Sequence, residues 1–362
     1  MNLAAIGHLK VFSGVIGHER VMSLLSNEIT QPAHAYLFVG PNGVGKATVA
    51  RLFAAALLCA DSGEHNEQCS SCRRVASGNH PDVLAVEADG ASSLGVDQAR
   101  STIGSANMTP VEGMRKIILI AEAGLMTNSA ANALLKTIEE PTASTMFVMV
   151  AESENDLPAT VASRCRTVQF GRVSESDLQA GLEKTGLEVK QAQNAARISG
   201  GRPGLALALA TQPDVATFRQ AWLSVPSRVT PKPGEAFRLA EELSLVSEPL
   251  MEAIRERHEG EESGSDTKAV RQRREREIKR ASQALTITGL EILASWYTDA
   301  AVAQFGGEIR NRDVNAVDLV LVRPATAVRN ADMVLDTVTA LRANQRQQLV
   351  LVDLFTHLGV SA

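Results

Sequence analysis

A glycine-rich segment at residues 40–48, GPNGVGKAT, carries the clearest chemical signal in the sequence. Its first seven residues match the phosphate-binding pattern G-x-x-x-x-G-K. In such a loop, glycines let backbone N–H groups turn inward around phosphate oxygens, and the lysine supplies a mobile cation. The pattern predicts a site for the phosphates of ATP or ADP, formed by Gly40, Pro41, Asn42, Gly43, Val44, Gly45, Lys46, Ala47 and Thr48.

The residues that hold Mg²⁺ in such a site are missing. Ala47 stands where a Ser or Thr hydroxyl binds the metal, and Thr48 lies one residue further, about 100° around a helix. After the apolar segment 116–120, Glu122 takes the place of the water-activating base, but the metal-orienting Asp is absent. Because phosphoryl transfer relies on the metal, we expect no appreciable ATP hydrolysis by this chain alone. Nucleotide binding without hydrolysis and an empty loop kept for its packing both stay open as interpretations.

Three of the four cysteines, Cys59, Cys69 and Cys72, lie within fourteen residues, whereas Cys165 stands apart. In a reducing compartment such a cluster indicates a metal site rather than disulfides. The N-terminus has no signal-peptide pattern and no run of 18 apolar residues occurs, so we expect a cytoplasmic protein.

The elements around the glycine-rich segment alternate between strands and helices. A short apolar run at 35–39 precedes the loop, and helical periodicity follows it at 46–59. Two further buried-strand segments, 116–120 and 146–151, flank a helix-like segment at 128–140. This alternation predicts an α/β domain with a parallel sheet and helices on both faces.

Beyond Phe170 the pattern becomes helical. Ser174 or Ser176 is suited to cap one helix, and the Gly200–Gly201 pair to end another. The segment 258–280 is acidic and Gly/Ser-rich at first, then carries seven basic and two acidic residues from Lys268 on. It reads most simply as a solvated loop and an exposed helix face; a helix that binds nucleic acid or a partner is the alternative.

Composition limits the function. The chain has 44% hydrophobic and 21% charged residues, which is ordinary for a globular protein with a sizeable core. Its formal net charge of -5 provides no overall positive field for nucleic acid. Any direct DNA contact would therefore have to come from a local patch.

Several of these stretches occur in an order that resembles bacterial DNA polymerase III clamp-loader subunits of the AAA+ class. The stretches are VFSGVIGHERVMSLL, HAYLFVGPNGVGK, the cysteine cluster leading to GNHPDV, SAANALLKTIEEP and SRCRTVQF. The resemblance covers residues 10–210 and is looser beyond them. It implies an AAA+ P-loop domain (1–172), a small helical lid domain (173–212) and an all-α collar domain for oligomerisation (213–362). The chain is most similar to non-hydrolysing members, whose metal-binding positions are degraded in the same places.

The resemblance implies a hetero-pentamer with motor subunits (gamma/tau) and delta, which loads the sliding clamp on primed DNA. It also gives Arg164, in the Ser-Arg-Cys triplet 163–165, the role of an arginine finger that enters the neighbouring subunit's ATP site. From its position alone, Arg164 would be assigned to a local salt bridge. Gly204 stands where active members carry an arginine that reaches the γ-phosphate, and Arg202 is a weak replacement because it precedes Pro203.

Zinc is the metal that the resemblance implies, in an insertion at 59–72. Family members use four cysteines, of which three are matched here, and Asn66 stands where the fourth is expected. His65 is therefore predicted to complete a structural Cys₃His site with Cys59, Cys69 and Cys72. A metal-free insertion and a redox-active pair of Cys69 and Cys72 are the alternatives. His80, Pro81 and Asp82 are expected to shape the return of the chain to the sheet.

Two other functions are compatible with the sequence. One is an active, ATP-hydrolysing clamp-loader motor subunit that uses Thr48 and Glu122 in an unusual arrangement. The other is a solitary zinc-containing scaffold with no role in replication, which would be a monomer without affinity for other AAA+ subunits.

Overall fold

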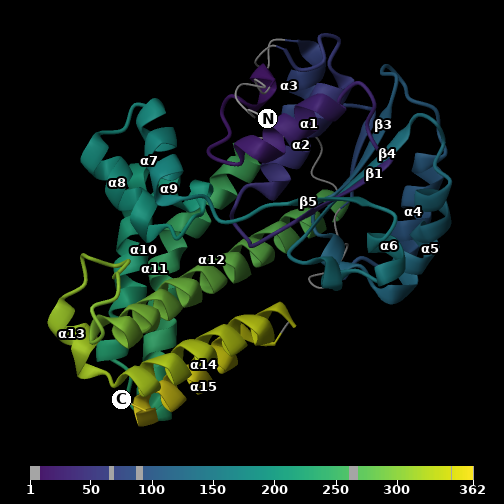
Figure 1. Ribbon diagram of the computed structural model, residues 1–362. Coiled ribbons are helices and arrows are strands. Elements are labelled where there is room, and N and C mark those ends of the chain that lie inside the picture. The colour runs from purple at the N-terminus through teal and green to yellow at the C-terminus, as the bar shows by residue number, and fades with distance from the viewer. Residues whose placement is uncertain (1–8, 65–68, 87–92, 261–267, 344, 362) are drawn as a thin grey trace. The chain divides into compact units, whose positions relative to one another are not determined.

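The computed structural model describes residues 9–64, 69–86, 93–260, 268–343 and 345–361. Figure 1 traces the chain, which forms two compact units, the first ending at Leu207 and the second beginning at Ala208. None of the helices in the described part of the chain combines the length and the apolar character that a bilayer crossing requires.

The first unit is built on five parallel strands in the order β2-β3-β4-β1-β5. The strands are β1 Ala35–Val39, β2 Val83–Val86, β3 Lys116–Ile120, β4 Thr145–Ala151 and β5 Arg166–Gln169. β4 lies between β3 and β1, with Leu37 opposite Met149 and Ile118 opposite Phe147. Strands buried on both faces read as continuous apolar runs, which is why β1, β3 and β4 were visible in the sequence. The predicted parallel sheet is confirmed.

Helices cover both faces of this sheet (Figure 1). One face carries α1 Glu19–Glu28, α2 Lys46–Leu58 and α3 Ser70–Ala76, and the other carries α4 Val96–Ala106, α5 Asn128–Glu139 and α6 Ala159–Ala162. Successive side chains of a strand point to opposite faces. Tyr36 and Phe38 of β1 accordingly pack with Phe53 of α2, whereas Leu37 packs in the opposite core with Leu134 of α5. Short 3-10 helices are η1 Lys10–Phe12, η2 Ala123–Leu125 and η3 Glu154–Asp156.

Three further helices follow β5: α7 Glu175–Lys184, α8 Val189–Ile198 and α9 Pro203–Thr211. Ser174 is the predicted cap, since its hydroxyl accepts a hydrogen bond from the N–H of Asp177 at the start of α7. Gly200 and Gly201 both adopt positive φ angles after α8. A side chain on Gly201 would also collide with Arg172, whose Cβ would lie 2.6 Å from the added carbon.

The described part of the second unit is helical. Its helices are α10 Pro213–Leu223, η4 Val225–Ser227, α11 Pro233–Gly260, α12 Lys268–Ala303, α13 Ala316–Leu321, α14 Pro324–Arg342 and α15 Gln347–Ser361. Trp222, Trp296 and Phe355 lie in one apolar core. A Cβ at Gly289 of α12 would lie 2.0 Å from the Trp222 ring, so only glycine lets these two helices pack as closely as they do.

Candidate functional site

The glycine-rich loop connects β1, which ends at Val39, to α2, which begins at Lys46. Gly40, Gly43 and Gly45 have φ angles of 148°, 78° and 101°, a region that side chains other than glycine rarely adopt. The strand, loop and helix predicted around this loop are confirmed. At its end, the carbonyl oxygen of Val44 lies 2.9 Å from Nε2 of His18.

The lysine of the loop is bound to the loop itself. The side chain of Lys46 is buried, with 6% exposure, and its ammonium donates to the carbonyl oxygens of Gly40 at 2.6 Å and Pro41 at 2.7 Å. A phosphate entering the loop would therefore compete with these carbonyls for the lysine charge.

A carboxylate also lies beside the loop. The side-chain amide of Asn42 donates to Oε1 of Glu152 at 2.7 Å, and the Gly40 N–H donates to the Glu152 carbonyl oxygen at 3.0 Å. Glu152 directly follows β4, the neighbour of β1, so the parallel sheet brings it to the edge where the loop starts. A negative charge here opposes the binding of phosphate. Glu152 is not among the site residues predicted from the sequence, although its position after a predicted strand is a usable signal.

Arg202 approaches the loop from the segment before α9. A Cβ added to Gly43 would lie 3.0 Å from Cδ of Arg202, so the stem of this arginine packs against the loop backbone. The side chain is buried, with 7% exposure, and its Nε donates to the Ser199 carbonyl oxygen at 2.9 Å. Arg202 thus contacts the loop, although its position before Pro203 gave no indication of this contact. Gly204 lies in the first turn of α9.

The candidate magnesium-binding residues come from two elements, the start of α2 and the end of β3. Ala47 and Thr48 are exposed on the first turn of α2, and Glu122 is exposed after β3. Within the described ranges, the one group of three or more His, Cys, Asp or Glu side chains close enough to share a metal ion is the cysteine cluster.

The cysteine cluster consists of Cys59, Cys69 and Cys72, whose sulfur atoms all lie within 4.8 Å of one another. Cys59 follows the last residue of α2, Cys69 caps α3, and Cys72 lies on α3. Three thiols at this separation fit a shared metal ion such as zinc, which binds Cys sulfur at about 2.3 Å. His65, the predicted fourth ligand, and the neighbouring Asn66 lie outside the described residues.

The thiols of the cluster differ in acidity. Burial raises the pKa of Cys72. Burial also acts to raise the pKa of Cys69, but hydrogen bonds involving Cys72 and Cys59 outweigh it, and the pKa of Cys69 falls below its usual value. A metal ion would bind the thiolate form of all three, with release of their protons.

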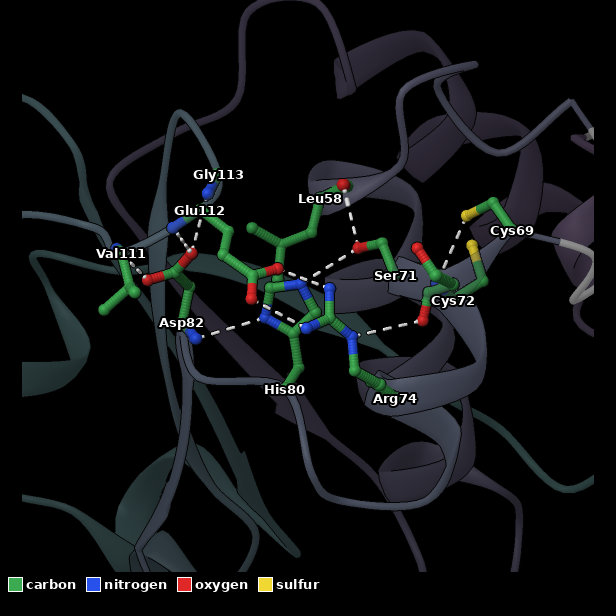
Figure 2. A network of polar contacts seen from close by, with 11 residues as sticks. Leu58, Cys69, Ser71, Cys72, Arg74, His80, Asp82, Val111, Glu112 and Gly113 are labelled. Carbon is green, nitrogen blue, oxygen red and sulfur yellow. Dashed lines mark hydrogen bonds and ion pairs between the residues drawn. The ribbon is translucent and has the colours of Figure 1, made fainter.

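A polar network attaches the cysteine helix α3 to the sheet (Figure 2). His80 Nδ1 accepts from the Asp82 N–H at 3.1 Å, so its Nε2 carries the proton and donates to the Ser71 hydroxyl at 3.0 Å. That hydroxyl in turn donates to the carbonyl oxygen of Leu58 at the end of α2. Burial lowers the pKa of His80, which favours this neutral form. The network fits the structural role predicted for His80.

Asp82 and Arg74 fix the loop before β3 (Figure 2). The Asp82 carboxylate accepts hydrogen bonds from three successive backbone N–H groups, those of Val111, Glu112 and Gly113, at 2.5, 2.9 and 2.7 Å. Burial acts to raise the pKa of Asp82, but these three bonds lower it further than burial raises it. Arg74 of α3 forms an ion pair with Glu112 in the same loop. The cysteine insertion and the loop 111–113 are thereby linked.

Arg164 lies between α6 and β5. Its guanidinium forms an ion pair with Glu139, the last residue of α5, and its Nη1 donates to the Thr160 carbonyl oxygen at 2.8 Å. Both side chains of the pair are partly exposed, at 38% and 41%. The adjacent Cys165 donates to the Val161 carbonyl oxygen at 3.2 Å, and burial raises the pKa of its thiol to about 12. It lies apart from the cysteine cluster, as predicted.

A family model described as "DNA polymerase III, delta subunit" matches residues 17–174. Over these residues the chain is similar to subunits of the DNA polymerase III clamp loader. The matched residues contain the sheet, the glycine-rich loop, the cysteine cluster and Arg164, and the match ends where α7 begins. The second unit lies outside it.

Curated relatives agree with the clamp-loader match. The chain is 42% identical to DNA polymerase III subunit delta' of Bacillus subtilis over 154 residues, which are 42% of this chain and 46% of the relative. It is 41% identical to subunit delta' of Pseudomonas aeruginosa over 37% of this chain and 42% of the relative. Subunit tau of Bacillus subtilis is 34% identical over 48% of this chain and 31% of the relative. The chain therefore spans less than half the length of these relatives.

Among solved structures, a DNA polymerase III gamma subunit-related protein from Thermotoga maritima matches with 17% identity and a TM-score of 0.45. The match covers 93% of this chain and 98% of that protein.

Proposed function

We propose that this chain is a non-hydrolysing subunit of the DNA polymerase III clamp loader, of the delta prime (stator) type. It assembles with motor subunits (gamma/tau) and delta into a hetero-pentamer that loads the sliding clamp on primed DNA. Residues 173–212 serve as its lid and 213–362 as the collar that holds the subunits together. The likeness to two delta' subunits supports this function, as does the family match over residues 17–174, which include the loop and Arg164.

The main support for this proposal comes from the contacts and the residue types of the glycine-rich loop. Its lysine is bound to loop carbonyls, a carboxylate lies at its rim, and Ala47 replaces the magnesium-binding hydroxyl. Since the metal supplies much of the charge stabilisation in phosphoryl transfer, this pocket is unsuited to hydrolysis. ATP or ADP can still bind here through the backbone N–H groups without being split.

Arg164 gives the chain a catalytic role in trans. A guanidinium carries five N–H donors in a planar fork, and at 38% exposure that of Arg164 is accessible to a neighbouring subunit. Placed in a motor subunit's ATP site, it donates to the oxygens of the γ-phosphoryl group and stabilises the charge that spreads over them during transfer.

The test mixes the purified chain with motor subunits and delta, and measures ATP hydrolysis stimulated by primed DNA. The wild-type chain is expected to be inactive alone and to stimulate the mixture. Arg164→Ala is expected to lower the rate of the mixture, while gel filtration shows that the complex stays intact. Arg100→Ala removes another exposed, ion-paired arginine and serves as the matched control.

Equal rates with wild-type and Arg164→Ala protein would refute the role in trans. ATP hydrolysis by the isolated chain, abolished by Lys46→Ala, would identify it instead as a motor subunit.

A further inference from the structure

We propose that Glu139 is a positioning residue that holds Arg164 on its own subunit until a phosphate group of the neighbouring subunit replaces it. The inference rests on the proposed role of Arg164 in trans. It also gives a function to Glu139 in the SAANALLKTIEEP stretch, which the proposed function leaves unexplained.

Glu139 has a fixed position at the end of α5. Thr127 caps the start of this helix, and Leu134 and Ile138 anchor it in the core below the sheet. The carboxylate therefore stands on a rigid element, whereas its own side chain is 41% exposed. α5 packs against α6, which precedes Arg164 in the chain.

Arg164 is held from both of these helices. Its Nη2 pairs with Glu139 of α5, and its Nη1 donates to the Thr160 carbonyl oxygen of α6 at 2.8 Å. The carboxyl-terminal end of α5 also carries the negative end of the helix dipole, which favours a cation at this place. The guanidinium is thus kept close to its own subunit by two anchors from different elements.

The pair with Glu139 is incompatible with full engagement of a triphosphate. A guanidinium that contacts the γ-phosphoryl group would bring the paired carboxylate close to the phosphate, and these like charges repel each other. Engagement therefore breaks the pair. Because exposed ion pairs are weak, breaking this one reduces the apparent affinity of engagement by about 1.4- to 5-fold.

The experiment titrates the chain into a fixed amount of motor subunits and delta with primed DNA and ATP. Glu139→Gln is expected to lower the half-saturating concentration of the chain by about 1.4- to 5-fold and to leave the plateau rate unchanged. Glu140→Gln removes the adjacent negative charge and is expected to match the wild type. Glu139→Asp keeps the charge and is also expected to stay near the wild-type value. Loss of a merely structural contact would instead raise the half-saturating concentration.

The Arg164→Ala background separates the two proposals. If Arg164→Ala equals the wild type, the proposed function in trans fails, and this inference fails with it. If Arg164→Ala lowers the plateau but Glu139→Gln leaves the half-saturating concentration unchanged or raises it, only the inference is wrong. The inference is also wrong if Glu139→Gln lowers the half-saturating concentration equally in the Arg164→Ala background. The same holds if Glu139→Asp lowers the half-saturating concentration as much as Glu139→Gln does.

Discussion

Replacement of Glu152 by glutamine is expected to strengthen nucleotide binding in the glycine-rich loop. The wild-type carboxylate accepts a hydrogen bond from Asn42 at 2.7 Å, so it lies at the rim of the place where phosphate would bind. Glutamine keeps an oxygen that can accept the same hydrogen bond, but it removes the negative charge. Any change in affinity therefore reports on the charge rather than on the shape of the loop.

The size of this effect follows from Coulomb's law. A unit charge about 6 Å from a phosphate charge contributes about 3 kcal/mol at an effective dielectric constant of 20 and about 0.7 kcal/mol in water. Glu152 is half-buried and bonded to an exposed amide, so the lower part of this range applies. About 1 kcal/mol corresponds to an increase in affinity of about fivefold.

Isothermal titration calorimetry with ADP, in buffer without magnesium, measures this affinity for both proteins. Glu154→Gln removes an exposed carboxylate two residues further along the chain and is expected to leave the affinity unchanged. An affinity of Glu152→Gln equal to or weaker than that of the wild type would refute the reasoning, as would a failure of both proteins to bind. Because Ala47 still lacks the magnesium-binding hydroxyl, the variant should not hydrolyse ATP.

Three further outcomes are expected. Gly289→Ala should lower the free energy of unfolding, measured by urea denaturation, by about 1–3 kcal/mol, because the new Cβ would lie 2.0 Å from the Trp222 ring. A Cβ at Gly234 would have no atom within 4 Å, so Gly234→Ala should not lower the free energy of unfolding in this way. Asp82→Asn should destabilise the protein by about 1–3 kcal/mol at pH 7. The pKa of Asp82 is lowered in the folded state, so the ionised carboxylate stabilises the fold above the unfolded pKa of about 3.9, and this stabilisation is lost as the pH falls through the folded pKa. The difference in free energy of unfolding between wild type and Asp82→Asn should therefore shrink below about pH 4. A difference that does not change with pH would contradict this. Elemental analysis should find about one zinc ion per chain, and Cys69→Ser should lose both the metal and thermal stability; a metal-free wild type would rule out the zinc site.

Much of the fold was predictable because its signals are local. Strands of a parallel sheet are buried on both faces, so β1, β3 and β4 appear as uninterrupted apolar runs. The glycine-rich loop has a fixed spacing because consecutive backbone groups must converge on one phosphate. Ala47 stands at a position where the phosphate-loop pattern carries Ser or Thr, and this departure can be read directly from the sequence. The three cysteines lie close in sequence, and α2 and α3 bring them together.

The tertiary contacts of the glycine-rich loop and of Arg164 join residues that are far apart in the chain. Glu152 reaches Asn42 across 110 residues because β4, late in the sequence, lies beside β1 in the sheet. Arg202 reaches the loop only because the chain after α8 returns to it. Arg164 finds Glu139 because α5 and α6 pack together. Such pairings depend on strand order and helix packing, which are stabilised by the whole core. The residue types next to each partner in the sequence therefore do not predict them. Sequence alone thus determined which residues the glycine-rich loop carries, and the tertiary structure decided which distant side chains contact it.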